Sequence, residues 1–143
     1  MCKSLMTLHV LELINTSLKE IRKRSEKINH ADDFLISESG VILLDSICMK
    51  LSAVGESIKN LDKITEHQLL PNYPEIPWKN VMGVRDFIVH HYFEVDADVI
   101  YGICKQDVPA LITVIERMME DLQKKRINKG NGLIKHKMKW QKE

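Results

Sequence analysis

Residues 44–61, LDSICMKLSAVGESIKNL, carry the clearest structural signal in this chain. Their apolar residues recur at steps of three and four, which places them on one face of an α-helix for about five turns. These residues are Leu44, Ile47, Leu51, Val54, Ile58 and Leu61. Gly55 interrupts the helix with a residue that costs about 1 kcal/mol relative to alanine. Either a neighbouring backbone approaches closely at this point, or the glycine is tolerated by chance.

The N-terminal part of the chain predicts another helix of the same kind. An apolar stripe with steps of three and four, or their sum, runs through about residues 4–28. Its members are Leu11, Ile14, Leu18, Ile21 and Ile28. Residues 29–36 are predicted to connect the two helices. Ser37 is the expected N-cap of the second helix, because its hydroxyl can accept a hydrogen bond from the first turn.

Prolines mark the boundary that follows. Residues 70–79 contain three prolines, and each disfavours helical geometry at the residue before it, so we expect an extended loop. A third helix is predicted over about residues 77–92, since proline suits a first helical turn. A short helix is expected from near Asp96, and a last long helix from around Asp107, with order fading near residues 130–132. The buried stripe of the last helix is Leu111, Ile115, Met118 and Leu122.

Four long helices with apolar stripes and short connectors predict an all-α fold. The expected architecture is an antiparallel four-helix bundle with one extra short helix. No stretch of the sequence alternates between apolar and polar residues as a half-buried strand would.

Length and composition are typical of one soluble globular domain, with 143 residues of which 44% are apolar and 29% charged. No apolar run approaches the ~18 residues that a membrane-spanning helix needs, and a signal-peptide cleavage site is missing. The three cysteines are widely spaced and form neither a zinc nor a disulfide pattern. We therefore expect a cytoplasmic protein with no membrane partner, no metal and no cofactor.

Charge is distributed unevenly along the chain. Residues 124–143 hold eight of the 21 basic residues and one of the 20 acidic ones, a net charge of +7, which leaves −6 for residues 1–123. This predicts a helical domain over residues 1–125 and a basic, flexible tail over residues 126–143. The tail either holds a phosphate backbone or is simply a solvated end.

The chemistry available to the chain is concentrated in residues 85–92, RDFIVHHY. Zinc-protease, Walker and nucleophile-elbow motifs are absent, and no pair of carboxylates stands out for two-metal hydrolysis. Cleavage of RNA without a metal needs a proton acceptor, a proton donor and a cation on the phosphate. His90 suits either proton transfer, and Arg85 suits the phosphate. Tyr92 can orient the phosphate or stack on a base.

Spacing alone does not bring these residues together. On one helix Arg85 and Tyr92 are nearly aligned, but His90 is rotated from Arg85 by roughly 140°. The two side chains converge if the helix turns near His90 or if two copies of it pack in a dimer. A purely structural role for the pair also fits the spacing.

An ordered set of motifs resembles the HepT-like HEPN toxins over about residues 5–122. The family's signature matches Arg85-x4-His90-x-Tyr92, and further motifs match before and after it. They are Val54-Gly55-Glu56-Ser57 (family IGEA), Pro74-Glu75-Ile76-Pro77-Trp78 (PEIPW), Gly83-Val84-Arg85-Asp86 (GMRN), His90-His91-Tyr92-Phe93 with Val95-Asp96 (HxYxxVD) and Asp107-Val108-Pro109-Ala110-Leu111 (DLPxL).

The resemblance implies a HEPN bundle that forms a homodimer and joins Arg85 and His90 of both copies in one cleft. It implies a metal-independent endoribonuclease that cuts RNA as the toxin of a type VII-like toxin–antitoxin pair. The implied partner is a minimal nucleotidyltransferase antitoxin of the MntA type, which transfers AMP to Tyr92. The added nucleotide would place negative charge and bulk where the substrate phosphate binds.

Two alternatives stay open beside the ribonuclease. One is a non-catalytic HEPN module that binds a nucleotide or a nucleotidyltransferase, and the other is a helical scaffold whose motif serves packing. Asp86 stands where the family often has asparagine, and it either orients Arg85 or weakens its hold on phosphate. His91 is a candidate second proton carrier, and Glu56 is a candidate for contact with the Arg85 site.

Overall fold

The computed structural model describes residues 3–91 and 94–141, with side chains up to residue 131. Throughout these residues the regular structure is helical, which confirms the all-α class. The α-helices are α1 (Lys3–Arg24), α2 (Glu38–Ile64), α3 (Trp78–Met82), α4 (Val84–His90), α5 (Ala97–Gly102) and α6 (Val108–Gln141). The shorter turns are η1 (Ala31–Phe34) and η2 (Leu70–Asn72), both 3₁₀, and the π-helical η3 (Ile103–Asp107). In the described ranges no helix is both long and apolar enough to cross a membrane.

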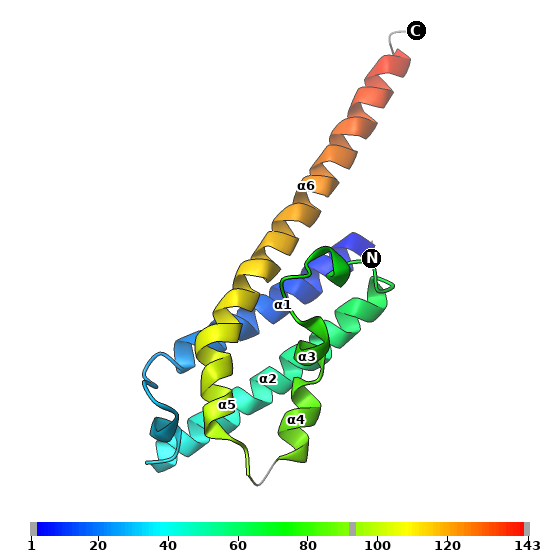
Figure 1. Ribbon diagram of the computed structural model, residues 1–143. Helices are drawn as coiled ribbons and strands as arrows, with labels where there is room; N and C mark the ends of the chain where they lie inside the picture. The colour runs from blue at the N-terminus through cyan, green and yellow to red at the C-terminus, as the bar shows by residue number, and fades with distance from the viewer. Residues whose placement is uncertain (1–2, 92–93, 142–143) are drawn as a thin grey trace.

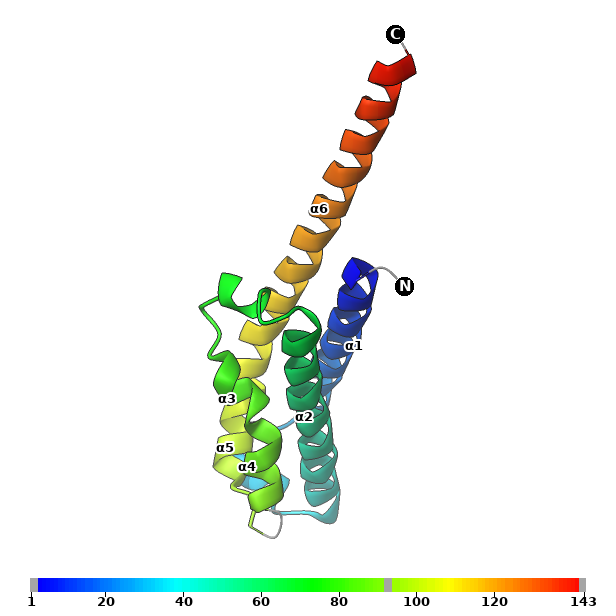
Figure 2. The same cartoon turned by 90° about the vertical axis from the view of Figure 1, so that its right-hand side faces the viewer.

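The long helices pack side by side around one apolar core (Figure 1). α1 lies against both α2 and α6, and α4 covers another side of α2, to which it runs antiparallel (Figure 2). Every apolar residue predicted for the stripes of the first two helices is buried. The largest side chains that are completely buried include Phe34, Leu11, Ile14, Ile58, Leu61, Ile115 and Met118. Apolar periodicity therefore predicted the core correctly, because it selects the residues that face neighbouring helices.

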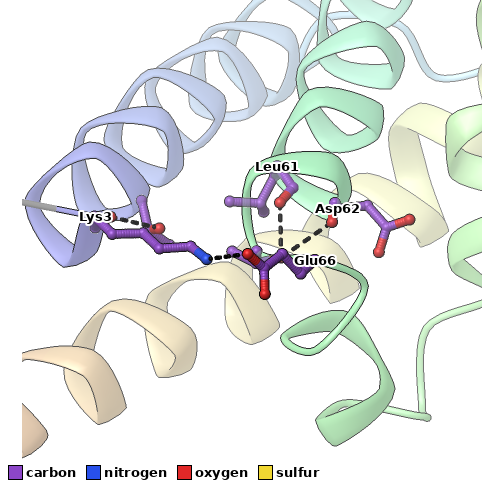
Figure 3. Close-up of polar contacts among 6 residues, drawn as sticks. Lys3, Leu61, Asp62 and Glu66 are labelled. Carbon is purple, nitrogen blue, oxygen red and sulfur yellow. Dashed lines mark hydrogen bonds and ion pairs between the residues drawn. The ribbon is translucent and has the colours of Figure 1, made fainter.

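Both ends of α2 are capped by hydrogen bonds. The Ser37 hydroxyl accepts a bond of 3.0 Å from the backbone of the first turn, as predicted. At the other end the His67 N–H donates to the Asp62 carbonyl at 2.8 Å, as in a Schellman motif. Glu66, which directly precedes His67, has a left-handed φ of 55°. Its carboxylate lies 3.2 Å from the Lys3 ammonium at the start of α1 (Figure 3).

The prediction of one helix over residues 77–92 is wrong. Gly83 separates the described part of that range into α3 and α4, and it is the C-cap of the first and the N-cap of the second. Three long helices and this short pair thus take the place of the four long helices expected. Glycine loses more backbone entropy in a helix than any other residue, so a helix is easily interrupted there.

The last helix begins at Val108, one residue after the predicted start, and the π-helical turn η3 links it to α5. Pro109 explains the wider turn, because proline lacks an N–H and its ring clashes with the carbonyl four residues earlier. α6 continues as a helix to Gln141, past the glycines at residues 130–132, where the sequence predicted that order fades. A domain boundary at residue 125 falls inside α6 and stays a prediction.

Three buried groups make the fold sensitive to alkali. Burial raises the pKa of the Cys48 and Cys104 thiols from 9.0 to about 11. It also raises the pKa of Tyr73 from 10.0 to about 12, aided by the bond of 2.7 Å that the Tyr73 hydroxyl donates to Asp121. Each folded-state pKa exceeds the ordinary value, so the neutral forms stabilise the fold below pH 9 and this stabilisation is lost as the pH rises through 11.

We expect the free energy of unfolding, measured with urea, to fall as the pH is raised from 9 to 11. A variant with Cys48→Ala and Cys104→Ala should start from a lower stability, because it loses buried atoms, but show a shallower dependence on pH. A slope equal to that of the unchanged protein would rule out the two thiols as the cause.

Candidate active site

The position of α4 depends on the absence of a side chain at Gly55 in α2. A Cβ atom built there would lie 2.8 Å from Cγ1 of Val84 and 3.0 Å from the carbonyl oxygen of Val81. The backbone nitrogen of Arg85 would be 3.7 Å away. The close backbone approach proposed from the sequence is therefore confirmed. It sets Arg85 directly over the middle of α2.

α4 has a buried side and an outward side. Its buried and half-buried residues are Val84, Phe87 and Ile88, and its exposed residues are Arg85, Asp86, Val89 and His90. Because α4 is helical from Val84 to His90, Arg85 and His90 point roughly 140° apart at the two edges of the outward side. Among the described residues, no hydrogen bond or ion pair joins them. A single copy of α4 presents both groups without bringing them together.

Glu56 contacts the candidate arginine. Its Oε1 lies 3.6 Å from Nη1 of Arg85 and 3.6 Å from Nζ of Lys59, one turn farther along α2. The side chains of Arg85 and Glu56 remain 50% and 45% exposed, so the pair is screened by water and contributes less than about 1 kcal/mol. Arg85 is thus positioned but free to exchange its partner for another anion. Lys59 escaped the sequence prediction, although its i, i+3 spacing from Glu56 was a signal for it.

Both histidines at the end of α4 are fixed to the backbone of their own helix. Nδ1 of His90 lies 2.6 Å from the carbonyl oxygen of Asp86, and Nδ1 of His91 lies 2.7 Å from that of Phe87. A carbonyl oxygen only accepts, so each Nδ1 carries the proton. In the neutral imidazoles Nε2 therefore holds the lone pair. The His91 ring also packs on Phe87, with the ring centres 4.6 Å apart, and both imidazoles are exposed.

The loop before α3 is tied to α6, which fixes where α3 and α4 start. Tyr73 donates to Asp121 of α6, and the guanidinium of Arg117 pairs with Glu75 and lies over the Tyr73 ring, 5.1 Å from its centre. Trp78 is buried, and its Nε1–H donates to the Tyr73 carbonyl at 2.8 Å. No sequence signal could have revealed the pair of Tyr73 with Asp121 or the pair of Arg117 with Glu75, since the partners in each lie more than forty residues apart.

The structure does not group all the residues predicted for the site. Arg85 and Glu56 are in contact, His90 and His91 are neighbours one helical turn farther on, and Tyr92 lies outside the described residues. In the described ranges the ion pair of Arg85 is made with Glu56 and not with the adjacent Asp86. Those ranges also contain no group of three or more histidine, cysteine or acidic residues that could hold a metal ion.

A cavity of about 370 Å³ lies between α1, α2, α3 and α6. Its walls are mostly apolar, and neither Arg85 nor His90 lines it. Arg85 and His90 therefore lie outside this cavity, on the exposed side of α4.

A comparison with protein families decides what kind of protein carries this face. The ribonuclease HepT-like family matches residues 14–118, most of the bundle and the whole of α4. The chain belongs to this family. The match confirms the resemblance to HepT-like proteins that the set of motifs indicated.

The names of curated relatives of this HepT-like chain also refer to ribonucleases. It is 32% identical over 123 residues to a protein of Methanocaldococcus jannaschii named "Gamma-glutamylcyclotransferase and putative RNase", which covers 86% of this chain and 50% of the relative. It is 32% identical over 73 residues to the "Probable ribonuclease HepT" of Thermococcus cleftensis, covering 51% and 63%. The chain thus spans about half to two thirds of the length of the relatives it matches. No solved structure shows a significant match to it.

Proposed function

We propose that this HepT-like chain is a metal-independent endoribonuclease that acts as a homodimer. The observation that carries the proposal is the outward side of α4, where Arg85 and His90 are both exposed, Arg85 in a weak pair with Glu56 and His90 held through Nδ1 by its own helix. A guanidinium is a permanent cation with donors matched to phosphate oxygens. An imidazole whose Nδ1 is engaged offers Nε2 as the single site for proton exchange.

These groups suffice for transesterification of RNA. Nε2 of His90 takes the proton of a 2′-hydroxyl, whose oxygen attacks the adjacent phosphorus and forms a 2′,3′-cyclic phosphate. The bond from phosphorus to the 5′-oxygen breaks, and a protonated imidazole donates a proton to that leaving oxygen. Arg85 stabilises the charge on the phosphate during the attack. The donor is a second imidazole, which is His90 of another copy or His91.

A second copy is required because a single α4 holds Arg85 and His90 apart. The outward surface also offers apolar area for such a contact. Val89 is 55% exposed between the two candidate residues, and Met49, two turns before Glu56 on the same side of α2, is 75% exposed. Ile42 continues this line at 60% exposure. Exposed apolar side chains that cluster in this way favour burial against a partner surface.

We further propose the biological setting that the motif set implies. The chain is the toxin of a toxin–antitoxin pair, and an MntA-type nucleotidyltransferase neutralises it by transferring AMP to Tyr92. Support comes from the order of the residues, since Tyr92 follows His90 by two positions and Arg85 by seven. An AMP group near the end of α4 would bring a phosphate that competes for the Arg85 guanidinium.

A single set of measurements tests the proposal. The purified protein should cut unstructured RNA in the presence of EDTA and leave 2′,3′-cyclic phosphate ends. Co-expression with a neighbouring nucleotidyltransferase gene should add the mass of one or more AMP units to the protein, and Tyr92→Phe should abolish this gain. Cleavage that EDTA abolishes, or a modification that persists in Tyr92→Phe, would contradict the respective part of the proposal.

A non-catalytic module that binds a nucleotide or a nucleotidyltransferase is the second candidate. It is favoured by the Glu56 carboxylate already placed on Arg85, by the adjacent Asp86 and by the net charge of −6 on residues 1–123. Expression in a bacterial host separates the two. A ribonuclease should slow growth and Arg85→Ala should relieve this, whereas a binding module should do neither.

A further inference from the structure

α6 continues far past the last residue that it buries in the bundle. Met118 is completely buried and Leu122 is half-buried, whereas residues 123–129 are all exposed. The helix nevertheless runs on to Gln141 and extends beyond all the other helices (Figures 1 and 2). The match to the HepT-like family ends at residue 118, so the family does not account for this extension.

The face that α6 buries in the bundle becomes basic where the helix leaves it. The buried stripe advances by four, three and four residues from Leu111 to Leu122. The next steps of four and three residues lead to Arg126 and Lys129. Guanidinium and ammonium groups cannot continue an apolar contact, because burial of an unpaired charge is too costly. This part of α6 is therefore suited to solvent or to a charged partner.

The positive charge of the extension is not neutralised within the described structure. Lys124, Lys125, Arg126 and Lys129 are exposed, and among the described residues none of them takes part in an ion pair. Like charges on adjacent turns repel each other and weaken the helix. A polyanion removes this repulsion and releases its own condensed counterions, which favours binding.

We infer that α6 from Lys124 to Gln141 is an arm that binds the phosphate backbone of RNA without reading its sequence. The inference rests on the proposed ribonuclease function, which supplies the polyanion. Residues 1–123 carry a net charge of −6 and repel such a substrate, while the arm and the two residues after it carry +7. Attraction at long range therefore comes from the arm, and α4 contributes the local contacts with the scissile phosphate.

Other partners fit the arm less well. Two arms from two copies would bring like charges together. A helix that lies on a membrane buries a continuous apolar face, and in the described part of the arm, residues 124–131, the exposed apolar side chain is Ile127. The sequence adds Leu133, Ile134, Met138 and Trp140 farther along, so the test below includes anionic vesicles. RNA requires only the exposed cations that the arm presents.

The distance between the arm and α4 sets a length requirement on the substrate. The two lie at opposite ends of the molecule (Figure 1). A long RNA can occupy both, and its attachment to the arm then raises its effective concentration at α4. A short oligonucleotide reaches only one of them. The arm should therefore lower KM for long RNA, leave kcat unchanged and have no effect on short substrates.

The experiment compares two variants in which four exposed cations become glutamine, a residue that favours helix. The arm variant changes Lys124, Lys125, Arg126 and Lys129, and the charge-matched control changes Lys23, Lys27, Lys63 and Lys79, all exposed on the bundle. Circular dichroism establishes that both are folded. Binding of long and short unstructured RNA is measured by fluorescence anisotropy over a range of salt concentrations, in a His90→Ala background that prevents cleavage. Cleavage of both RNAs is measured with His90 intact.

For long RNA the arm variant should bind on the order of tenfold more weakly at low salt, and the slope of log Kd against log salt should fall by about 3, close to 0.7 for each lost phosphate contact. The control should change neither quantity nearly as much. An arm variant with unchanged affinity, or an equal loss in the control, would overturn the inference. Binding to anionic phospholipid vesicles that the arm variant loses while its RNA affinity stays unchanged would also overturn it, in favour of a membrane.

The two proposals fail in different ways. If the unchanged protein cuts no RNA but the arm variant still loses affinity for long RNA, the ribonuclease proposal fails and the arm stands. If the protein cuts both RNAs and the arm variant cuts the long one with the same KM, the ribonuclease stands and the arm fails.

Discussion

His90→Ala should lower kcat for RNA cleavage by on the order of 10²–10⁴, the usual contribution of one acid–base group. The imidazole is exposed on α4, and its Nδ1–H is held by the Asp86 carbonyl at 2.6 Å, so Nε2 is the atom that exchanges protons. The substitution removes this atom and leaves the buried side of α4 intact. RNA binding should therefore change much less than kcat. Initial rates at saturating RNA, together with Kd measured by anisotropy, test both statements.

His9→Ala is the matched control, since His9 is exposed on α1 and distant in sequence from α4. It should retain the full rate of cleavage. A His90→Ala variant that cuts RNA at the rate of this control would exclude His90 from the chemistry, and the second imidazole at the end of α4, His91, would become the group to test.

Gly55→Ala should destabilise the protein by about 1–3 kcal/mol, although alanine is the better helix former by about 1 kcal/mol. The added methyl group would lie 2.8 Å from Cγ1 of Val84 and 3.0 Å from the carbonyl oxygen of Val81. A side chain can rotate away, but the backbone carbonyl moves only with α3 and α4. Arg85, whose nitrogen is 3.7 Å from the same point, would shift with them. Loss of stability should therefore come with a loss of cleavage rate.

Gly102→Ala supplies the opposite expectation. This glycine also lies in a helix, but among the described residues no atom lies within 4 Å of the Cβ that alanine would add. The gain in helix propensity, about 1 kcal/mol, is then not offset by a clash. Urea unfolding of the two variants should show a loss at Gly55 and a gain at Gly102. A gain at both would mean that α4 moves away from α2 at no cost, and that Gly55 does not fix the position of Arg85.

The sequence alone was sufficient to predict most of the core. Apolar residues at helical spacing are buried because spacing decides which side chains face a neighbouring helix, and the stripe from Leu44 to Leu61 shows this at every position. The N-cap of α2 follows an equally local rule, as Ser37 illustrates. The glycine at position 55 pointed to a close backbone contact, which the structure contains.

What the sequence could not predict depends on tertiary contacts. The break at Gly83 is one case, since a glycine inside a helical pattern is tolerated in some helices and ends others. The pair of Glu56 with Arg85 is another, because it joins two helices whose relative placement no spacing rule defines. The geometry of the shared site stays a prediction, since it depends on the contact between two copies of the chain.

The long extension of α6 also gives the molecule a large electric dipole moment. Residues 124–143 carry a net charge of +7 and residues 1–123 carry −6, so an external field exerts a torque on the whole protein. Near a polyanion the C-terminal end turns forward before any contact forms, which raises the rate at which the arm meets the polyanion. At physiological ionic strength this steering acts over only about 8 Å, so association should slow steeply as salt is added.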